Sequence, residues 1–200
     1  MSGFADTLRR RPNPYIAAAI SAVVLIGSLA QAIEHRASIL RDGREILLRT
    51  EPIDPRDLMR GDYVRLGYAD VSSVSDDMVT GSWPSTETVQ PVWLTLAADG
   101  DGIFTARSAS FTRPENVAAD EVVLKSLPVR VRAASGLRYS IPQLDFGIER
   151  YYVPEGEGLE IEKAQNQGRT TVAVRVSAEG EPQIARLMID GETLYNEPLY

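Results

Sequence analysis

The chain has 200 residues, of which 44% are hydrophobic and 24% are charged, a composition typical of a folded protein. Its net charge of −7 argues against nucleic-acid binding, because an acidic surface repels the phosphate backbone. It has no Cys and only one His, which excludes disulfides, thiolate nucleophiles and zinc sites that need Cys or several His.

Residues 15–33 (YIAAAISAVVLIGSLAQAI) contain no charge and predict a transmembrane anchor, since a helix needs about 20 apolar residues to cross the bilayer. Arg9, Arg10 and Arg11 precede this segment. The positive-inside tendency therefore predicts a cytoplasmic N-terminus at residues 1–14, a single pass through the inner membrane, and a periplasmic C-terminal domain.

A cleaved signal peptide is the alternative, because Ala30-Gln31-Ala32 fits the small-residue cleavage pattern. Both interpretations export the rest of the chain. Residues 1–33 carry three Arg and one Asp, a charge of +2, so the overall −7 leaves −9 on residues 34–200. The exported part is thus the acidic part.

Residues 34–45 (EHRASILRDGRE) are expected to extend the helix by a turn or two and then form a linker. From residue 46 to residue 200 the hydrophobic pattern changes to period two, which predicts short strands. The two β-prone runs on either side of residues 99–102 (DGDG) predict a hairpin. Residues 71–90 are expected to form a mobile connection or an edge excursion, and residues 155–167 a helix.

The expected strands lie within residues 45–52, 62–74, 89–99, 102–112, 122–134, 137–142, 146–154, 170–180, 182–191 and 192–200. Many strands with frequent Gly and Pro predict a mainly β fold. We expect an antiparallel β-sandwich or barrel-like domain with one short helix, preceded by a single N-terminal transmembrane helix.

Residues 54–68 (DPRDLMRGDYVRLGY) combine residues typical of the two ends of a short helix with a strand pattern. Asp54 suits a helix N-cap, Pro55 the first helical position, and Gly61 the end of a single turn. We therefore interpret the Arg-Gly-Asp triplet as a turn before a strand that begins at Asp62, rather than as an adhesion motif. In that strand Val64, Leu66 and Tyr68 share one face.

The stretch GDYVRLGY resembles the signature of the GDYXXLXY family at Gly61, Asp62, Tyr63, Leu66 and Tyr68. The approach to it, with Asp54, Pro55, Arg56, Asp57 and Arg60, and the second stretch FGIERYYVPEGEGLEIE at residues 146–162 also resemble this family. The second stretch contributes Gly147, Glu149, Arg150, Tyr152, Pro154, Glu155 and Gly156. The resemblance runs from about residue 44 to the C-terminus. It implies a bacterial, membrane-associated protein, with multi-spanning membrane proteins as fusion partners or gene neighbours of some members, and it brings no catalytic residues.

The second stretch is also the best candidate for chemistry. Glu149 is a possible acid or base, and Arg150 a possible clamp for a carboxylate. If the protein is an enzyme, we expect its site to use Asp62, Glu149, Arg150 and Tyr151. The structural alternative, which we favour, is an ion pair that ties the two motifs together. It would join Glu149 or Arg150 to Arg56, Arg65, Asp57 or Asp62.

Four glutamates precede or begin the expected helix, where carboxylates favour the helix dipole: Glu155, Glu157, Glu160 and Glu162. Their spacing matches no calcium loop, so we predict no metal site and no cofactor.

These features predict a membrane-anchored extracytoplasmic binding or scaffold domain, acting as an accessory subunit or assembly factor of a membrane complex. Its expected partners are a multi-spanning membrane protein and, through residues 15–33, the lipid bilayer. Two alternatives stay open: a carboxylate-based hydrolase or lyase of envelope polymers, and a glycan- or peptide-binding module.

Overall fold

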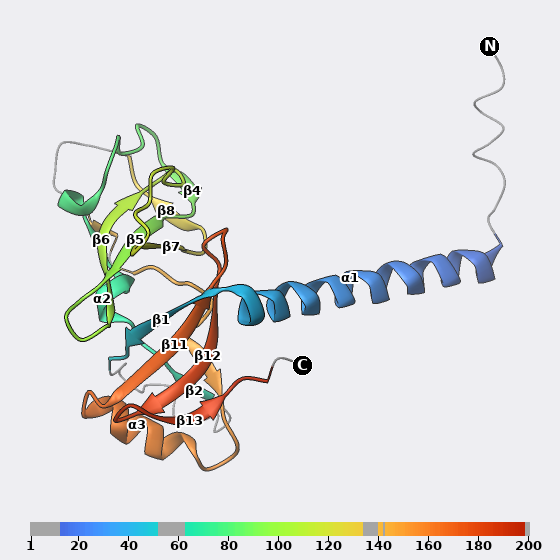
Figure 1. The fold of residues 1–200 in the computed structure, drawn as a ribbon. Helices are drawn as coiled ribbons and strands as arrows, with labels where there is room; N and C mark the ends of the chain where they lie inside the picture. Colours follow the sequence, from blue (N-terminus) through green and yellow to red (C-terminus); the bar gives the residue numbers. More distant parts are fainter. Residues whose placement is uncertain (1–12, 52–62, 134–139, 142, 199–200) are drawn as a thin grey trace. The chain divides into compact units, whose positions relative to one another are not determined.

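The computed structural model describes residues 13–51, 63–133, 140–141 and 143–198 (Figure 1). The chain divides into two units, residues 1–38 and residues 39–200, and each is described by itself. The first contains most of helix α1 (Pro14–Asp42), and the second contains all the strands.

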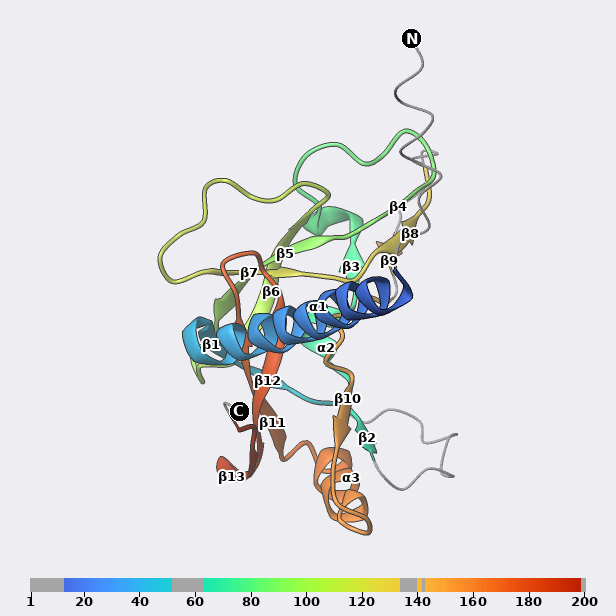
Figure 2. The same ribbon diagram turned by 90° about the vertical axis from the view of Figure 1, so that its right-hand side faces the viewer.

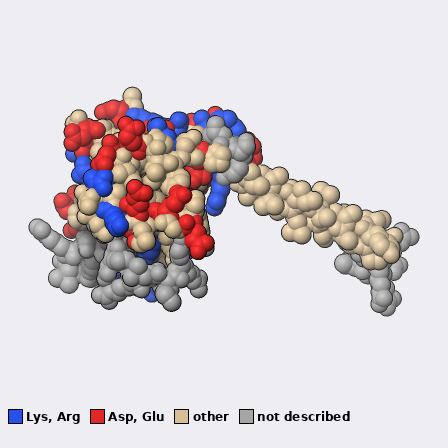
Figure 3. All heavy atoms as spheres, turned by 90° about the horizontal axis from the view of Figure 1, so that it is seen from below, with Lys and Arg blue, Asp and Glu red and all other residues tan. Residues whose placement is uncertain are grey.

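Helix α1 is long and apolar enough to cross a membrane. Its apolar side chains, among them Val24, Leu25 and Leu29, are exposed. Figure 3 shows its surface without Lys, Arg, Asp or Glu over most of its length, whereas both charge signs are interspersed on the β-rich unit. The predicted anchor at residues 15–33 lies within this helix.

The helix also occupies most of the segment that we expected to be a linker. It continues to Asp42, and strand β1 starts at Arg44. Only Gly43 separates the two elements, and a Cβ atom at this position would lie 2.4 Å from the carbonyl oxygen of Ile39. The change from helix to strand therefore requires a residue without a side chain at Gly43.

The largest sheet has the order β1-β11-β12-β13 and is antiparallel throughout. It joins β1 (Arg44–Arg49) to β11 (Thr170–Val176), β12 (Pro182–Ile189) and β13 (Glu192–Asn196). Ile46 lies opposite Val174, and Leu48 lies opposite Val172, and all four are buried. The alternation of the sequence thus places one apolar face of this sheet in the core.

A second sheet has the order β6-β5-β7. It consists of β5 (Trp93–Ala98), β6 (Phe104–Ser110) and β7 (Val122–Lys125). The predicted hairpin between β5 and β6 is confirmed. The Asp99 carboxylate closes its turn, because Oδ1 accepts hydrogen bonds from the amides of Asp101 and Ile103, both at 2.9 Å.

Three short antiparallel pairs complete the sheets: β2 (Tyr63–Arg65) with β10 (Arg150–Tyr152), β3 (Val74–Ser75) with β9 (Ser140–Ile141), and β4 (Thr88–Gln90) with β8 (Val129–Val131). The short helices are α2 (Ala69–Ser72), the 3-10 helix η2 (Asp76–Met78) and α3 (Gly158–Asn166). The predicted fold class, mainly β with an N-terminal apolar helix, is confirmed.

One local expectation was wrong, and a second was wrong in part. The strand expected over residues 62–74 ends at Arg65, and its continuation turns into helix α2. The stretch at residues 71–90 holds parts of four short elements, and its residues Val71 and Val74 are fully buried. They belong to the same core cluster as Leu48 and Leu94, so the start of this stretch is packed into the core, whereas residues 75–90 are half-buried or exposed.

Candidate functional site

Strands β2 and β10 bring the two sequence motifs together, although their residues lie about 80 positions apart in the sequence. Val64 pairs with Tyr151, and the Leu66 amide donates to the carbonyl oxygen of Glu149 at 2.9 Å. Figure 2 shows the two strands side by side, with α3 next to them. The site is therefore built by backbone pairing between the motifs.

The inner side of this pair lies in the core. Val64, Leu66 and Tyr68 are buried, as their predicted common face requires. The Tyr68 hydroxyl donates to the carbonyl oxygen of Ile148 at 2.8 Å. Burial, and secondarily the nearby charge of Glu149, raise the pKa of Tyr68 well above its ordinary value of 10.0. Tyr68 therefore stays protonated and acts as a fixed donor to β10.

The carboxylate of Glu149 closes the turn that leads into β10. Its Oε1 accepts from the Phe146 amide at 2.5 Å, and its Oε2 accepts from the Gly147 amide at 2.9 Å. Gly147 has a φ of +81°, a left-handed conformation that favours glycine. Both carboxylate oxygens thus stabilise the backbone of the second motif.

The expected ion pair between the motifs is not formed within the described residues. Glu149 binds backbone amides, and Arg65 lies directly opposite Arg150, another cation. The other expected partners, Arg56, Asp57 and Asp62, lie outside the described residues. Backbone hydrogen bonds, rather than complementary charges, therefore join the described parts of the two motifs.

The outer side of the pair carries two arginines and two tyrosines, which we call the Arg–Tyr face: Tyr63, Arg65, Arg150 and Tyr152. Arg65 is opposite Arg150, and Tyr63 is opposite Tyr152. The Arg150 Cζ atom lies 5.7 Å from the centre of the Tyr63 ring, and the two tyrosine rings are 6.0 Å apart. Tyr152 is 71% exposed, so this face is open to solvent.

Tyr151, a candidate for catalysis, points to the opposite side of β10. It is buried and lies 6.0 Å from the Tyr195 ring. Burial, followed by the neighbouring Glu197 carboxylate, raises its pKa above the ordinary range. The structure therefore separates Tyr151 from Arg150, and Asp62 lies outside the described residues.

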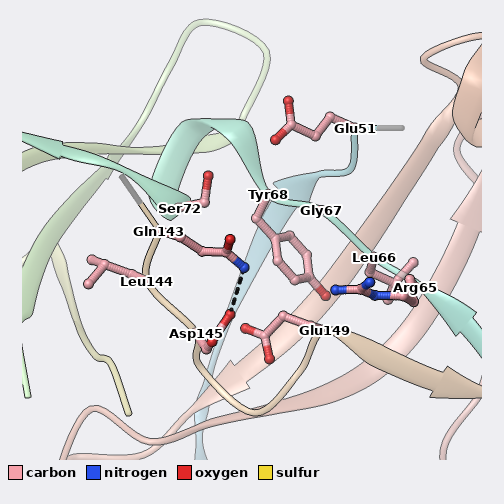
Figure 4. Close-up of a pocket in the computed structure, with 10 residues that line it drawn as sticks. All are labelled: Glu51, Arg65, Leu66, Gly67, Tyr68, Ser72, Gln143, Leu144, Asp145 and Glu149. Atoms are coloured by element: carbon pink, nitrogen blue, oxygen red, sulfur yellow. Dashed lines mark hydrogen bonds between the residues drawn. The ribbon is translucent and has the colours of Figure 1, made fainter. Parts of the chain in front are cut away.

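A pocket of about 250 Å³ opens beside the strand pair (Figure 4). It is lined by Glu51, Arg65, Leu66, Gly67, Tyr68, Ser72, Gln143, Leu144, Asp145 and Glu149. Gln143 Nε2 donates to Asp145 Oδ1 at 3.2 Å, and the Leu144 amide donates to the Ser72 carbonyl at 2.6 Å. Arg65 belongs both to this pocket and to the Arg–Tyr face, so the two features adjoin.

Gln165 of α3 supports the site and was missed in the sequence. Its side chain is buried, and Nε2 donates to the carbonyl oxygens of Glu51 at 2.5 Å and Arg65 at 3.2 Å. The signal was present, because Gln165 shares the buried face of α3 with Ile161 and Ala164, where an amide needs hydrogen-bond partners.

The remaining motif residues form the turn between β10 and α3. The Pro154 carbonyl accepts from the Glu157 amide at 3.2 Å, Gly156 has a φ of +90°, and Glu155 is exposed. In the part of the chain that the structure describes, no group of three or more His, Asp and Glu is placed to hold a metal. Seven predicted residues lie outside that part: Asp54, Pro55, Arg56, Asp57, Arg60, Gly61 and Asp62.

Comparison with known protein families identifies the chain's relatives. A family model described as GDYXXLXY protein matches residues 24–187, a range that contains both motifs and the C-terminal half of the apolar segment. No curated protein and no solved structure matches the chain.

Proposed function

Because the chain belongs to the GDYXXLXY family and carries a helix long and apolar enough to span a membrane, we propose that it is a single-pass, membrane-anchored binding domain. Its role would be that of an accessory subunit or assembly factor of a membrane protein complex. The anchor would keep the binding domain beside a multi-spanning partner.

The Arg–Tyr face is the observation that carries this proposal. Tyr and Arg are enriched among the residues that dominate protein–protein binding, because each combines a large contact area with a polar end. Here two of each lie on one small exposed sheet, and the turn that leads into β10 is held by hydrogen bonds from Tyr68 and to Glu149. A rigid, preformed face of this kind binds without a large ordering cost.

The charge distribution supports an extracytoplasmic location for this face. Arg9, Arg10 and Arg11 precede the apolar helix, and the residues that follow it are acidic overall. The positive-inside tendency then favours a cytoplasmic N-terminus and an exported domain.

The enzymatic alternative receives less support from the geometry. An acid–base role for Glu149 requires a carboxylate that can exchange protons with a substrate. Both of its oxygens instead accept backbone hydrogen bonds, and Tyr151 lies on the other side of the strand from Arg150. These contacts favour binding over catalysis.

The test is purification of the intact chain from native membranes in mild detergent, with mass spectrometry of the chain and of the proteins that accompany it. We expect an uncleaved N-terminus and a stoichiometric membrane protein. A solitary chain, or purified protein that turns over an envelope polymer, would refute the proposal.

A further inference from the structure

The two arginines of the Arg–Tyr face are directly opposed in register, Arg65 on β2 and Arg150 on β10. Like charges directly opposite each other destabilise an antiparallel pair. In the largest sheet, by contrast, a carboxylate neutralises neighbouring arginines, since Arg175 and Arg186 both form ion pairs with Glu45 on β1. The opposed arginines are therefore a local cost to the stability of this strand pair.

Within the described residues, no carboxylate lies within 4.0 Å of Arg65 or Arg150. The Arg150 guanidinium lies over the Tyr63 ring, which supports it by a cation–π contact. Two exposed guanidinium groups on neighbouring strands can offer parallel N–H donors to one carboxylate, a geometry that arginine favours over lysine.

We propose that the Arg–Tyr face binds a carboxylate side chain of an acidic peptide segment in the partner protein. The carboxylate lies between Arg65 and Arg150. Tyr63 and Tyr152 form the neighbouring residue pair on the same face, and their rings contact the adjacent part of the peptide. This inference rests on the proposed function and names the chemistry of the partner.

Charge favours a peptide over an extended polyanion or an anionic membrane surface. Residues 34–200 carry a net charge of −9, because three Arg and one Asp lie before them in a chain of −7. A domain with this charge repels surfaces that are negative over many ångströms, and the repulsion acts within a screening length of about 10 Å. A single carboxylate with apolar neighbours meets mainly the local pair of arginines, although Arg65 also borders the pocket that Glu51, Asp145 and Glu149 line.

The first test uses the full chain in neutral detergent micelles. Two short, terminally blocked peptides are compared, one with two Glu separated by an apolar residue and the other with Gln in place of each Glu. Binding is followed by the NMR signals of the Arg65 and Arg150 side-chain N–H groups. We expect saturable shifts with the Glu peptide and none with the Gln peptide.

Arg65→Gln and Arg150→Gln should each weaken binding of the Glu peptide by about tenfold or more, because one of the two guanidinium groups that bind the carboxylate is lost. Arg107→Gln is the matched control, since Arg107 is an exposed strand arginine away from the face and should leave binding unchanged. Without peptide, the two test variants should melt at or above the wild-type temperature, because a like-charge contact is removed. Equal binding of both peptides, shifts caused only by inorganic phosphate or phosphatidylglycerol vesicles, or no shift with any probe would overturn the proposal.

The second test separates this inference from the proposed function. The Arg65→Gln/Arg150→Gln double variant is purified from native membranes beside the wild type. Loss of the partner from the variant alone supports the inference. A partner that stays with both chains overturns it and leaves the proposed function standing. A wild-type chain without a partner that still binds the Glu peptide refutes the proposed function alone.

Discussion

Replacement of Glu149 by Gln distinguishes a structural carboxylate from a catalytic one. The wild-type side chain accepts from Phe146 at 2.5 Å and from Gly147 at 2.9 Å. Glutamine keeps one acceptor oxygen but turns an NH2 group toward the second amide, so two donors face each other. The remaining hydrogen bond also loses its charge, and the turn into β10 is weakened.

The magnitude follows from these two contacts. A hydrogen bond to a charged group contributes about 1.5–3 kcal/mol, and Glu149 is half-buried, so loss of one bond and weakening of the other should cost about 2 kcal/mol. For a domain of this size, 2 kcal/mol corresponds to a decrease in melting temperature of about 4–8 °C.

The assay is thermal and urea unfolding of the full chain in detergent, followed by the near-ultraviolet circular dichroism of Trp83 and Trp93. Glu155→Gln is the matched control, because Glu155 is an exposed glutamate of the same motif and its replacement should leave stability nearly unchanged. The reasoning is refuted if Glu149→Gln abolishes biological function while its melting temperature stays equal to that of the wild type. That outcome would assign Glu149 to chemistry.

Three further predictions follow from the same contacts. Gln165→Leu leaves two carbonyl oxygens without their donor and should cost about 1–3 kcal/mol in urea unfolding, whereas Asn166→Leu, on the exposed side of α3, should change stability little; equal effects would contradict this role for Gln165. Because the folded-state pKa values of Tyr68 and Tyr151 are raised above the unfolded value of 10.0, their stabilisation is complete below about pH 10 and is lost as the pH rises through the raised values. Unfolding free energies measured at increasing alkaline pH should therefore fall above pH 10, with a smaller slope in Tyr68→Phe, and a slope equal to that of the wild type would be inconsistent with this origin. A C-terminal fusion to a reporter that is active only outside the cytoplasm should be active, and activity of a cytoplasm-specific reporter at the same position would reverse the proposed topology.

The sequence predicted those parts of the fold that depend on local pattern. The apolar segment at residues 15–33, the turn at Asp99 and the helix after Gly156 each have a signal within a few residues, and each lies where it was expected. The common face of Val64, Leu66 and Tyr68 followed from the period of a strand.

The rest depended on contacts between distant residues, which a single sequence does not specify. The strand after Tyr63 stops at Arg65 because the following residues pack as helix α2 against the core, with Val71 fully buried. Similarly, the hydrogen-bond partners of Glu149 could not be predicted from the sequence. Its charge predicted an arginine, yet the turn at Gly147 brings two backbone amides closer than any described arginine.

The pairing of β1 with β11 has a consequence for the order in which the protein folds. The Thr50 hydroxyl, directly after β1, donates to the carbonyl oxygen of Thr170 across 120 residues of sequence. The backbone groups of β2 likewise pair with those of β10, which lies far along the sequence. Such a high contact order favours slow folding, because a long loop must close before the contact is made. Strand β1 is thus synthesised first but can pair only after β11 has been synthesised. The β-rich unit therefore completes its core only after nearly the whole chain is available.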